Sequence, residues 1–239
     1  MFQIIPPAMP RRLYRYRSVK LPEHLERELV AIAEGSLWFS QLDKLNDADE
    51  GKFDLTPTVK RRKDHQKIEE EVRRKMRDMG ICCFSDSHEI DLMWTHYANE
   101  HQGICVEYST HDLSNRLKQG SETISAVRVQ YDIQFPILGE KDIDDPTLAA
   151  AKAISSKKSD NYHEREWRLL ACRKGKMCFE LRNPDTDLNP VKGVYFGIRT
   201  QDHVINTVRC SLRGVKNDKI EFFKPARLDR RYGYRWDKF

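Results

Sequence analysis

Hydrophobic and polar positions change their spacing several times along the chain. In "LYRYRS" two arginines, Arg15 and Arg17, alternate with two tyrosines, which is the period-two pattern of a strand. Residues 21–35 instead carry apolar side chains at helical spacing, with Pro22 near the start and Gly35 at the end. The pattern therefore predicts a strand that is followed directly by a helix.

The rest of the chain mixes strands and helices without a regular alternation. Helical spacing recurs over residues 60–80, 91–101 and 144–163. Further strands are predicted in "SLWFS", "GICCFSD", "GICVEYS", "TISAVRVQYD", "EREWRLLACR", "MCFEL", "VKGVYFGIR" and "KIEFFKPARL". No stretch resembles a linker, so we expect a single α+β domain over residues 1–239, with mixed or largely antiparallel sheets and flanking helices.

Two charged segments have simple structural interpretations. Residues 60–80 mix both charges at helical spacing, which favours a solvated helix over a nucleic-acid-binding face. Residues 41–54, "QLDKLNDADEGKFD", predict an exposed loop with a solvated acidic tip. The acidic segment 47–52 is also compatible with half of a metal-dependent nuclease motif, through Glu50 and Lys52.

Composition excludes some functions and leaves others open. The 42 Lys and Arg residues outnumber the 37 Asp and Glu residues only slightly, so charge does not decide for or against nucleic-acid binding. Motifs of the GxGxxG, GxxxxGK[ST], GxSxG and HExxH types are missing from the sequence. His96 and His101 are five positions apart, whereas two zinc ligands on one helix face are three or four apart, so we expect no metal.

The sequence also suggests a cellular location. "MFQIIPPAMPRR" is interrupted by prolines and lacks the long apolar core of a signal peptide, and no window is apolar enough to cross a membrane. None of the six cysteines forms a CxxC pair, which favours reduced thiols. We therefore expect a cytoplasmic protein without a membrane partner.

Two strand-like segments carry candidate functional groups. Arg15 and Arg17 share one strand face, where they would clamp a phosphate or form surface ion pairs. Glu164, Glu166 and Arg168 share a face of the strand predicted in "EREWRLL". That face is either a sheet surface with cross-strand pairs or the position of a rigid catalytic carboxylate.

The C-terminal segment 224–239, "KPARLDRRYGYRWDKF", alternates basic and aromatic residues. This composition suits phosphates and stacked bases, as in a nucleic-acid-binding module. The alternative, which we favour, is that the segment docks on the domain through its aromatic side chains.

Several blocks of the sequence resemble the bacterial domain-of-unknown-function family 2971. They occur in the order "LYRYRS", "LWFSQLDKLNDADEG", "ICCFS", "LMWTHYANEHQGICVEY", "EREWRLL" and "VYFGI". The resemblance spans nearly the whole chain, and "MWTHYANEHQGICVEY" is its most specific block. Leu45 departs from the family pattern, in which Phe precedes Asn-Asp.

The order of these blocks is more loosely similar to the ADP-ribosyltransferase fold. That resemblance implies a basic residue for NAD on an early strand and a catalytic Glu on a late strand. It implies Glu166, Glu164 and His96 as catalytic residues, and Arg15, Arg17, Ser40, Trp94 and Tyr97 as NAD-binding residues. In this interpretation Arg15 and Arg17 face the same cleft as His96.

The resemblance implies an enzyme that cleaves NAD and passes ADP-ribose to a protein, a nucleic acid or water. NAD would be the substrate, without a metal, and the bacterial setting suggests a toxin or phage-defence effector. The alternatives are a nucleic-acid-binding module, a metal-dependent nuclease that uses residues 47–52, and a purely structural interaction protein.

Overall fold

The computed structural model describes residues 9–119, 124–172, 175–178, 189–213, 220–227 and 233–239. The chain forms two compact units, each assembled from separate segments. Unit 1 comprises Met1–Gly35, Ser85–Gln119 and Glu180–Phe239, and unit 2 comprises Ser36–Phe84 and Gly120–Phe179.

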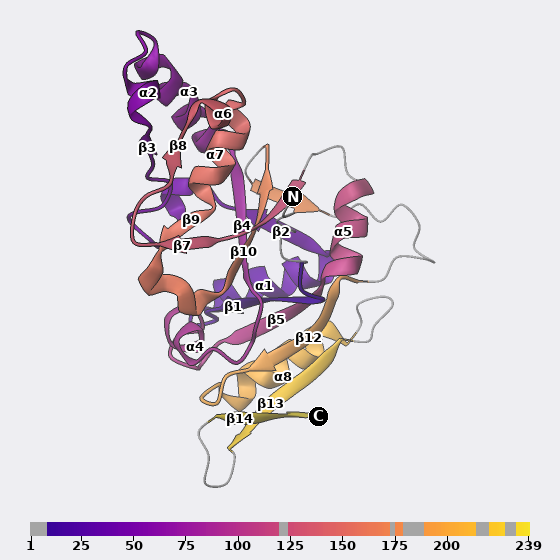
Figure 1. Cartoon of the computed structure of the whole chain (residues 1–239). Coiled ribbons are helices and arrows are strands. Elements are labelled where there is room, and N and C mark those ends of the chain that lie inside the picture. Colours follow the sequence, from indigo (N-terminus) through magenta and orange to yellow (C-terminus); the bar gives the residue numbers. More distant parts are fainter. Residues whose placement is uncertain (1–8, 120–123, 173–174, 179–188, 214–219, 228–232) are drawn as a thin grey trace, which may run out of the picture. The chain divides into compact units, whose positions relative to one another are not determined.

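Unit 1 is built on strands that neighbour one another in the order β14-β13-β12-β5-β1 (Figure 1). All pairs are antiparallel except β12 with β13, which is parallel. Its elements are β1 (Arg12–Arg17), α1 (Pro22–Glu34), α4 (Asp91–Tyr97), β5 (Ile104–Ser109), α5 (Thr110–Gln119), β12 (Val191–Phe196), α8 (Asp202–Leu212), β13 (Glu221–Arg227) and β14 (Tyr234–Lys238). The predicted strand and helix at the start of the chain are confirmed, and Gly35 ends α1 in the left-handed conformation, with φ 63°.

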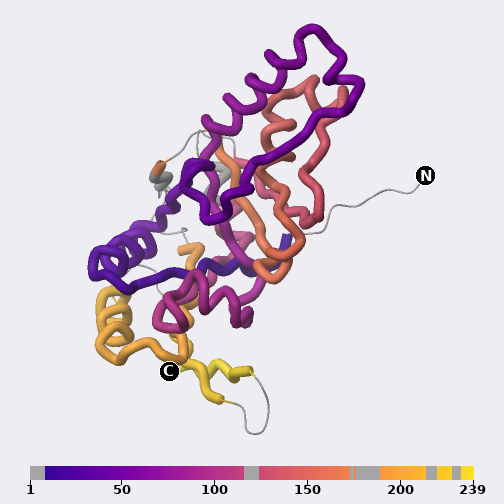
Figure 2. The backbone as a smooth tube through the Cα atoms, turned by 90° about the vertical axis from the view of Figure 1, so that its left-hand side faces the viewer, coloured from indigo at the N-terminus to yellow at the C-terminus, as the bar shows by residue number. Residues whose placement is uncertain are grey.

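The two faces of β1 are covered by different helices. On one face Tyr16 packs edge-on against Trp94 of α4, with ring centroids 5.2 Å apart. On the other face the Arg17 Nε donates to Glu28 Oε2 of α1 over 3.0 Å. Successive residues of a strand point to opposite faces, so α4 and α1 cover opposite faces of β1. Figure 2 shows that α1 and α8 lie side by side.

Unit 2 combines short strands with two longer helices. Antiparallel β6 and β10 pair with each other, and β10 also neighbours β4; smaller pairs are β11 with β2, β3 with β8 and β7 with β9. Its elements are β2 (Ser36–Phe39), η1 (Leu42–Lys44), β3 (Asp54–Leu55), α2 (Pro57–Lys60), α3 (His65–Asp78), β4 (Gly80–Ser85), β6 (Ile124–Arg128), β7 (Gln130–Asp132), β8 (Ile137–Leu138), α6 (Glu140–Ile143), α7 (Pro146–Ile154), β9 (Ser156–Lys158), η2 (Ser159–Glu164), β10 (Glu166–Ala171) and β11 (Gly175–Cys178).

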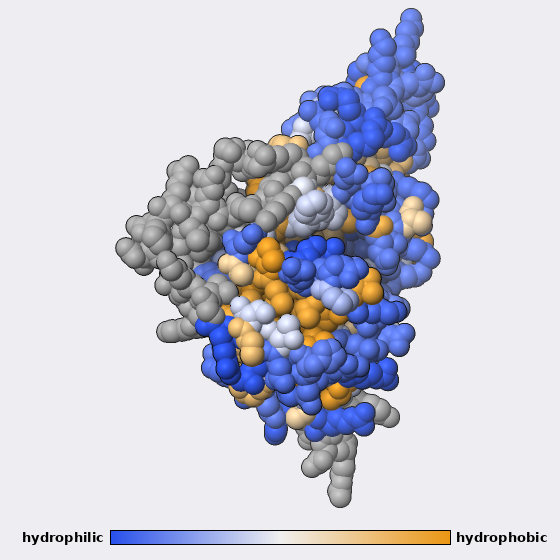
Figure 3. Space-filling view, turned by 180° about the vertical axis from the view of Figure 1, so that it is seen from behind, coloured by the Kyte–Doolittle hydropathy of each residue, from blue (hydrophilic) through white to orange (hydrophobic). Residues whose placement is uncertain are grey.

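The helices α3 and α7 of unit 2 pack against each other over a hydrophobic core (Figure 1). Val72 and Met76 are the buried residues of α3, four positions apart on one face. The other faces carry ion pairs at helical spacing, such as Arg73–Glu69 at 2.7 Å. In Figure 3 the end of unit 2 that holds α2 and α3 is almost entirely hydrophilic. The prediction of a solvated helix in this segment is confirmed.

The α+β class predicted from the sequence is confirmed, because helices accompany mixed, mostly antiparallel strands in the structure. The described cysteine side chains are free thiols, namely Cys82, Cys83, Cys105, Cys172 and Cys210, whereas the Cys178 side chain lies outside the described residues. In the part of the chain that the structure describes, no helix combines the length and the apolar composition needed to span a membrane.

A left-handed turn connects α4 to β5 in unit 1. Asn99, Glu100 and His101 all have positive φ angles, of 49°, 52° and 67°. The turn brings backbone atoms close to Gly103, where an added Cβ would lie 2.2 Å from the Arg17 carbonyl oxygen and 2.9 Å from the Ala98 carbonyl oxygen. Only glycine fits here, because backbone atoms of two other segments occupy the space.

We expect Gly103→Ala to destabilise the protein by about 3 kcal/mol or more, the upper end of the usual cost of overpacking, because the clash involves backbone rather than a flexible side chain. Urea unfolding of the variant measures this loss. Gly139→Ala is the control, since a Cβ there makes only ordinary contacts at 3.6 Å or more. Equal stability of the two variants would contradict the packing at Gly103.

Candidate functional site

Five charged side chains are buried together in unit 2. We call Glu50, Lys157, Glu164, Glu166 and Arg168 the charge cluster; their side chains are 4%, 5%, 7%, 6% and 0% exposed. Burying an ion costs several kcal/mol unless partners compensate it. In this cluster each buried charge lies against at least one charge of the opposite sign.

Arg168 is the centre of the charge cluster. Its Nη1 and Nη2 each donate to one carboxylate oxygen of Glu50 over 2.7 Å, which makes a bidentate pair. Its Nε donates to Glu166 Oε1 over 2.8 Å, and Nη2 donates to Glu166 Oε2 over 3.0 Å. Nη1 also donates to the carbonyl oxygen of Ile154 at the end of α7. These bonds use all five N–H groups of the guanidinium.

Lys157 joins the three carboxylates of the charge cluster from β9. Its Nζ lies 2.6 Å from Glu164 Oε2, 3.2 Å from Glu166 Oε2 and 3.4 Å from Glu50 Oε1. Burial disfavours the charged ammonium, but the carboxylates outweigh this effect and raise the pKa of Lys157 above its ordinary value. The lysine is thus held protonated.

Glu166 is ionised in spite of its burial. Desolvation opposes the charge, but Arg168 and Lys157 outweigh it and lower the pKa of Glu166 to about 2. The Cys83 thiol also bonds to this carboxylate, and the pKa of Cys83 is raised by burial and by the Glu166 charge. The backbone N–H of Glu166 donates to the Tyr131 hydroxyl over 2.8 Å, which fixes the start of β10.

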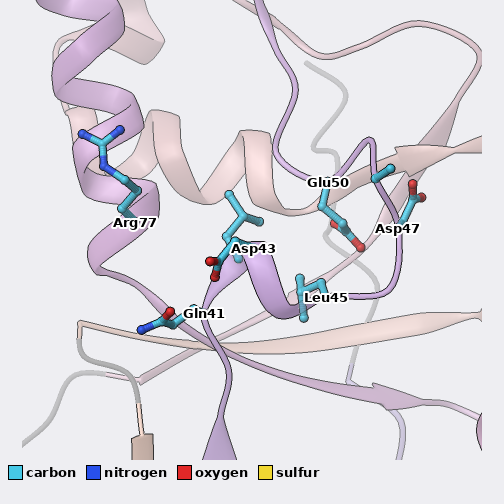
Figure 4. A pocket seen from close by; sticks show the side chains of 8 residues that line it. Gln41, Asp43, Leu45, Asp47, Glu50 and Arg77 are labelled. Carbon is cyan, nitrogen blue, oxygen red and sulfur yellow. The ribbon is translucent and has the colours of Figure 1, made fainter.

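A cavity of about 470 Å³ opens beside Glu50 (Figure 4). It is lined by Gln41, Leu42, Asp43, Leu45, Asp47, Ala48, Glu50 and Arg77. Arg77 projects from α3, whereas the other labelled side chains come from the segment between β2 and β3. Asp47 is fixed by Asn161, whose Nδ2 donates to Asp47 Oδ2 over 2.8 Å. The wall of the cavity thus carries three carboxylates and one guanidinium.

A smaller cavity of about 150 Å³ shares Asp47 with the first one. Its lining includes Lys52, Lys157, Lys158 and Phe135. Among the residues that the structure describes, no group of three or more His, Cys, Asp or Glu side chains is arranged to hold a metal ion.

The sequence pointed to part of the charge cluster. Glu166 and Arg168 share a face of β10 as expected, but Glu164 does not, because it lies in η2 before the strand begins. The predicted solvated tip of the acidic loop is wrong at Glu50, whose carboxylate is buried against Arg168. Glu50 and Lys157 were not proposed as members of one site with Glu166. Ser40 also lies in unit 2, where its backbone pairs with Ile81.

The other predicted site residues belong to unit 1. Within this unit the sheet separates Arg15 and Arg17 from His96. Arg17 pairs with Glu28 on the face of β1 that α1 covers, and strand alternation directs Arg15 to the same face. His96 and Trp94 belong to α4, which packs on the opposite face. The expectation that Arg15 and Arg17 face the same cleft as His96 is therefore wrong.

Trp94, His96 and Tyr97 have different surroundings within α4. Trp94 is 2% exposed and donates from Nε1 to the His88 carbonyl oxygen over 2.7 Å. His96 is exposed and Tyr97 is half-buried. Trp94 is therefore part of the hydrophobic packing of unit 1.

The C-terminal segment makes its described contacts within unit 1. Trp236 of β14 stacks on Trp94 with ring centroids 5.4 Å apart, and Lys238 pairs with Glu221 at 2.5 Å. Arg235 pairs with Asp237 at 2.6 Å. Residues 228–232 of the predicted docking segment 224–239 lie outside the described residues.

The low pKa of Glu166 predicts how stability depends on pH. The folded pKa of about 2 lies below the ordinary value of 4.5 for a glutamate, so the ionised side chain contributes stability above pH 4.5 that is lost as the pH falls towards 2. This difference corresponds to about 3 kcal/mol. We expect Glu166→Gln to be less stable than the wild type by about that amount at pH 7, and the difference to shrink between pH 4.5 and 2.

Urea unfolding at a series of pH values measures this effect. The control is Glu26→Gln, because Glu26 is exposed on α1. A stability difference for Glu166→Gln that does not change with pH would contradict the ion pairing of Glu166.

Of three comparisons with known proteins, one found a match. Neither the curated proteins nor the solved structures contain a match to this chain. Residues 93–169 match the model of a family described as "Protein of unknown function (DUF2971)". This segment includes Lys157, Glu164, Glu166 and Arg168 of the charge cluster, but not Glu50. The resemblance to the DUF2971 family is thus confirmed over residues 93–169.

Proposed function

We propose that unit 2 contains the active site of an enzyme that cleaves the bond between nicotinamide and ribose in NAD. The observation that supports this function is an excess of carboxylates at and behind the wall of the larger cavity. ADP-ribose would then pass to water, to a protein or to a nucleic acid.

The excess is visible in both layers of the site. The charge cluster contains three carboxylates but only two cations, Lys157 and Arg168. The cavity wall adds Asp43 and Asp47 to Glu50, against the single guanidinium of Arg77. The negative charge of such a wall favours a positively charged species. Because the carboxylates are held in place before that species forms, they need not reorganise to stabilise it.

Cleavage of NAD produces charge of the required sign. The nicotinamide ring is a cation while it is bonded to ribose, and the ribosyl group takes on oxocarbenium character as that bond breaks, as in glycoside hydrolysis. A cavity of about 470 Å³ also lies within the range of about 300–1,000 Å³ that is common for small-molecule sites. Charge and size therefore agree with a nicotinamide riboside moiety as the bound group.

The contacts favour a division of roles between Glu50 and Glu166. Glu50 lines the cavity, so we assign to it the carboxylate that faces the ribose. Glu166, the catalytic residue expected from the sequence, binds Arg168 and Lys157, and Arg168 in turn fixes Glu50. Glu166 would thus act by keeping Glu50 in position. Glu164 would act in the same way through Lys157.

The same carboxylates would also attract a divalent cation, as the alternative metal-dependent nuclease requires. Both oxygens of Glu50 are engaged by Arg168, at 2.7 Å each. We therefore favour a cationic substrate over a metal. The enzyme would act in the cytoplasm, where NAD is abundant, and its biological role would be that of a bacterial toxin or phage-defence effector.

We expect the purified protein to release nicotinamide from NAD, and Glu50→Gln to slow this release about 100- to 1,000-fold, the usual effect of losing one electrostatic group that stabilises a transition state. Glu166→Gln should also be slower, because Glu50 is then held less firmly. Nicotinamide release is measured by chromatography, with water, protein extract and RNA as acceptors, and each variant is compared at equal folded fraction. Glu26→Gln is again the control.

Two results would contradict the proposed NAD-cleaving function. If the wild type releases no nicotinamide with any of these acceptors, or if Glu50→Gln is as fast as the wild type, the NAD-cleaving function is wrong. Cleavage of DNA or RNA that requires Mg²⁺ or Mn²⁺ and stops with EDTA would instead favour the nuclease.

A further inference from the structure

Unit 1 contains a second group of polar side chains, placed on the face of its sheet that carries Tyr14 and Tyr16. His88 is the central member, with a side chain that is 18% exposed. Its ring lies 5.0 Å from the ring of Tyr14, 4.2 Å from that of Tyr195 and 5.4 Å from that of Trp236, between centroids. The imidazole is thus enclosed by aromatic rings on several sides.

A fixed carboxylate lies at the edge of these rings. Glu107 of β5 accepts a hydrogen bond from the Tyr195 hydroxyl over 2.7 Å and pairs with Arg12 Nε at 2.7 Å. The Glu107 side chain is 12% exposed. Its register partner on β1 is Tyr14, which places the carboxylate beside the Tyr14 ring.

Two polar groups of this site have no hydrogen-bond partner within the described part of the chain. They are the hydroxyl of Tyr14 and the ring nitrogens of His88, of which Nε2 lies 4.0 Å from Glu89 Oε1, beyond hydrogen-bond distance. Burial lowers the pKa of His88 to about 4, so the imidazole is neutral at pH 7 and has one donor and one acceptor nitrogen. Half-buried polar groups in this state are suited to a ligand that supplies the missing hydrogen bonds.

We propose that these residues bind a planar nitrogen heteroaromatic ring, the ring class of the nucleobases. Tyr14 and the face of Trp236 that is turned away from Trp94 would provide the stacking contacts. His88 and the Tyr14 hydroxyl would complete the hydrogen bonds of the ring edge. Glu107, fixed by Arg12 and Tyr195, would accept from an exocyclic amino group.

A charged ligand fits this site less well than a neutral ring. The only carboxylate in the group is already paired with Arg12, and the imidazole is neutral. The polar atoms are few and surround an aromatic wall, which is the usual composition of a site for a small planar ligand. This binding site is separate from the NAD-cleaving function, since it uses residues of unit 1 alone.

Two conservative variants test the site without removing its rings. His88→Phe keeps an aromatic ring and loses the ring nitrogens, and Tyr14→Phe loses only the hydroxyl. The matched control is His203→Phe, because His203 belongs to the same unit and is exposed on α8. Equilibrium dialysis of the full chain with radiolabelled adenosine, guanosine, cytidine and uridine measures binding, and unlabelled ribose competes for any contact made by the sugar alone.

We expect at least one nucleoside to bind, and His88→Phe to weaken its binding about ten-fold, in the range of one lost hydrogen bond or stacking contact. Tyr14→Phe should weaken it several-fold, whereas His203→Phe should bind as the wild type does. Melting temperatures of the three variants establish that they are folded.

The site is refuted if none of the four nucleosides binds at concentrations up to about 10 mM, a very weak affinity, or if ribose competes fully. It is also refuted if His88→Phe binds the nucleoside as well as His203→Phe does. If Glu50→Gln abolishes nucleoside binding and His88→Phe does not, the nucleoside binds in unit 2. This result contradicts the site in unit 1 and leaves the proposed NAD-cleaving function intact.

Discussion

The bidentate ion pair between Arg168 and Glu50 joins residues that lie 118 positions apart in the sequence. It connects β10 with the acidic segment between β2 and β3, and Arg168 also bonds to the end of α7 through Ile154. A planar guanidinium can bind two carboxylates and a carbonyl at fixed angles, which a lysine at this position could not do. The arrangement of unit 2 around its larger cavity therefore depends on this one side chain.

Stability alone does not explain why the charge cluster is buried. Apolar residues of similar volume often stabilise a protein as well as a buried ion pair does, or better, because desolvation offsets much of the attraction between the charges. Burying five such groups, with one more carboxylate than cations, costs more desolvation free energy than filling the same space with apolar side chains. What apolar residues cannot supply is a carboxylate held at a cavity wall, and Glu50 is in that position.

Local patterns in the sequence were sufficient to predict α1, β1 and the shared face of Glu166 and Arg168, because residues near each other in the chain determine these features. The position of Glu50 was predicted wrongly, since a turn-rich acidic segment is normally solvated and only a distant arginine changes this. The separation of Arg17 from His96 also depends on tertiary contacts: α1 follows β1 and covers one of its faces, and α4 covers the other. The short strand β14 was not predicted, since pairing with β13 determines it.

The proposed site of unit 1 and the charge cluster of unit 2 would favour different kinds of ligand, because their own charges are compensated in different ways. In unit 1 the single carboxylate of Glu107 is matched by Arg12, and His88 is neutral, so hydrogen bonds and ring stacking remain as the means of binding. In the charge cluster of unit 2 three carboxylates stand against two cations, so a positive charge in the cavity would be favoured before any hydrogen bond is counted. Glu50 is already immobilised by Arg168, and it loses little side-chain freedom when such a charge forms. This restraint is what an oxocarbenium-like transition state requires of its surroundings, because groups that are fixed beforehand need not reorganise during the reaction.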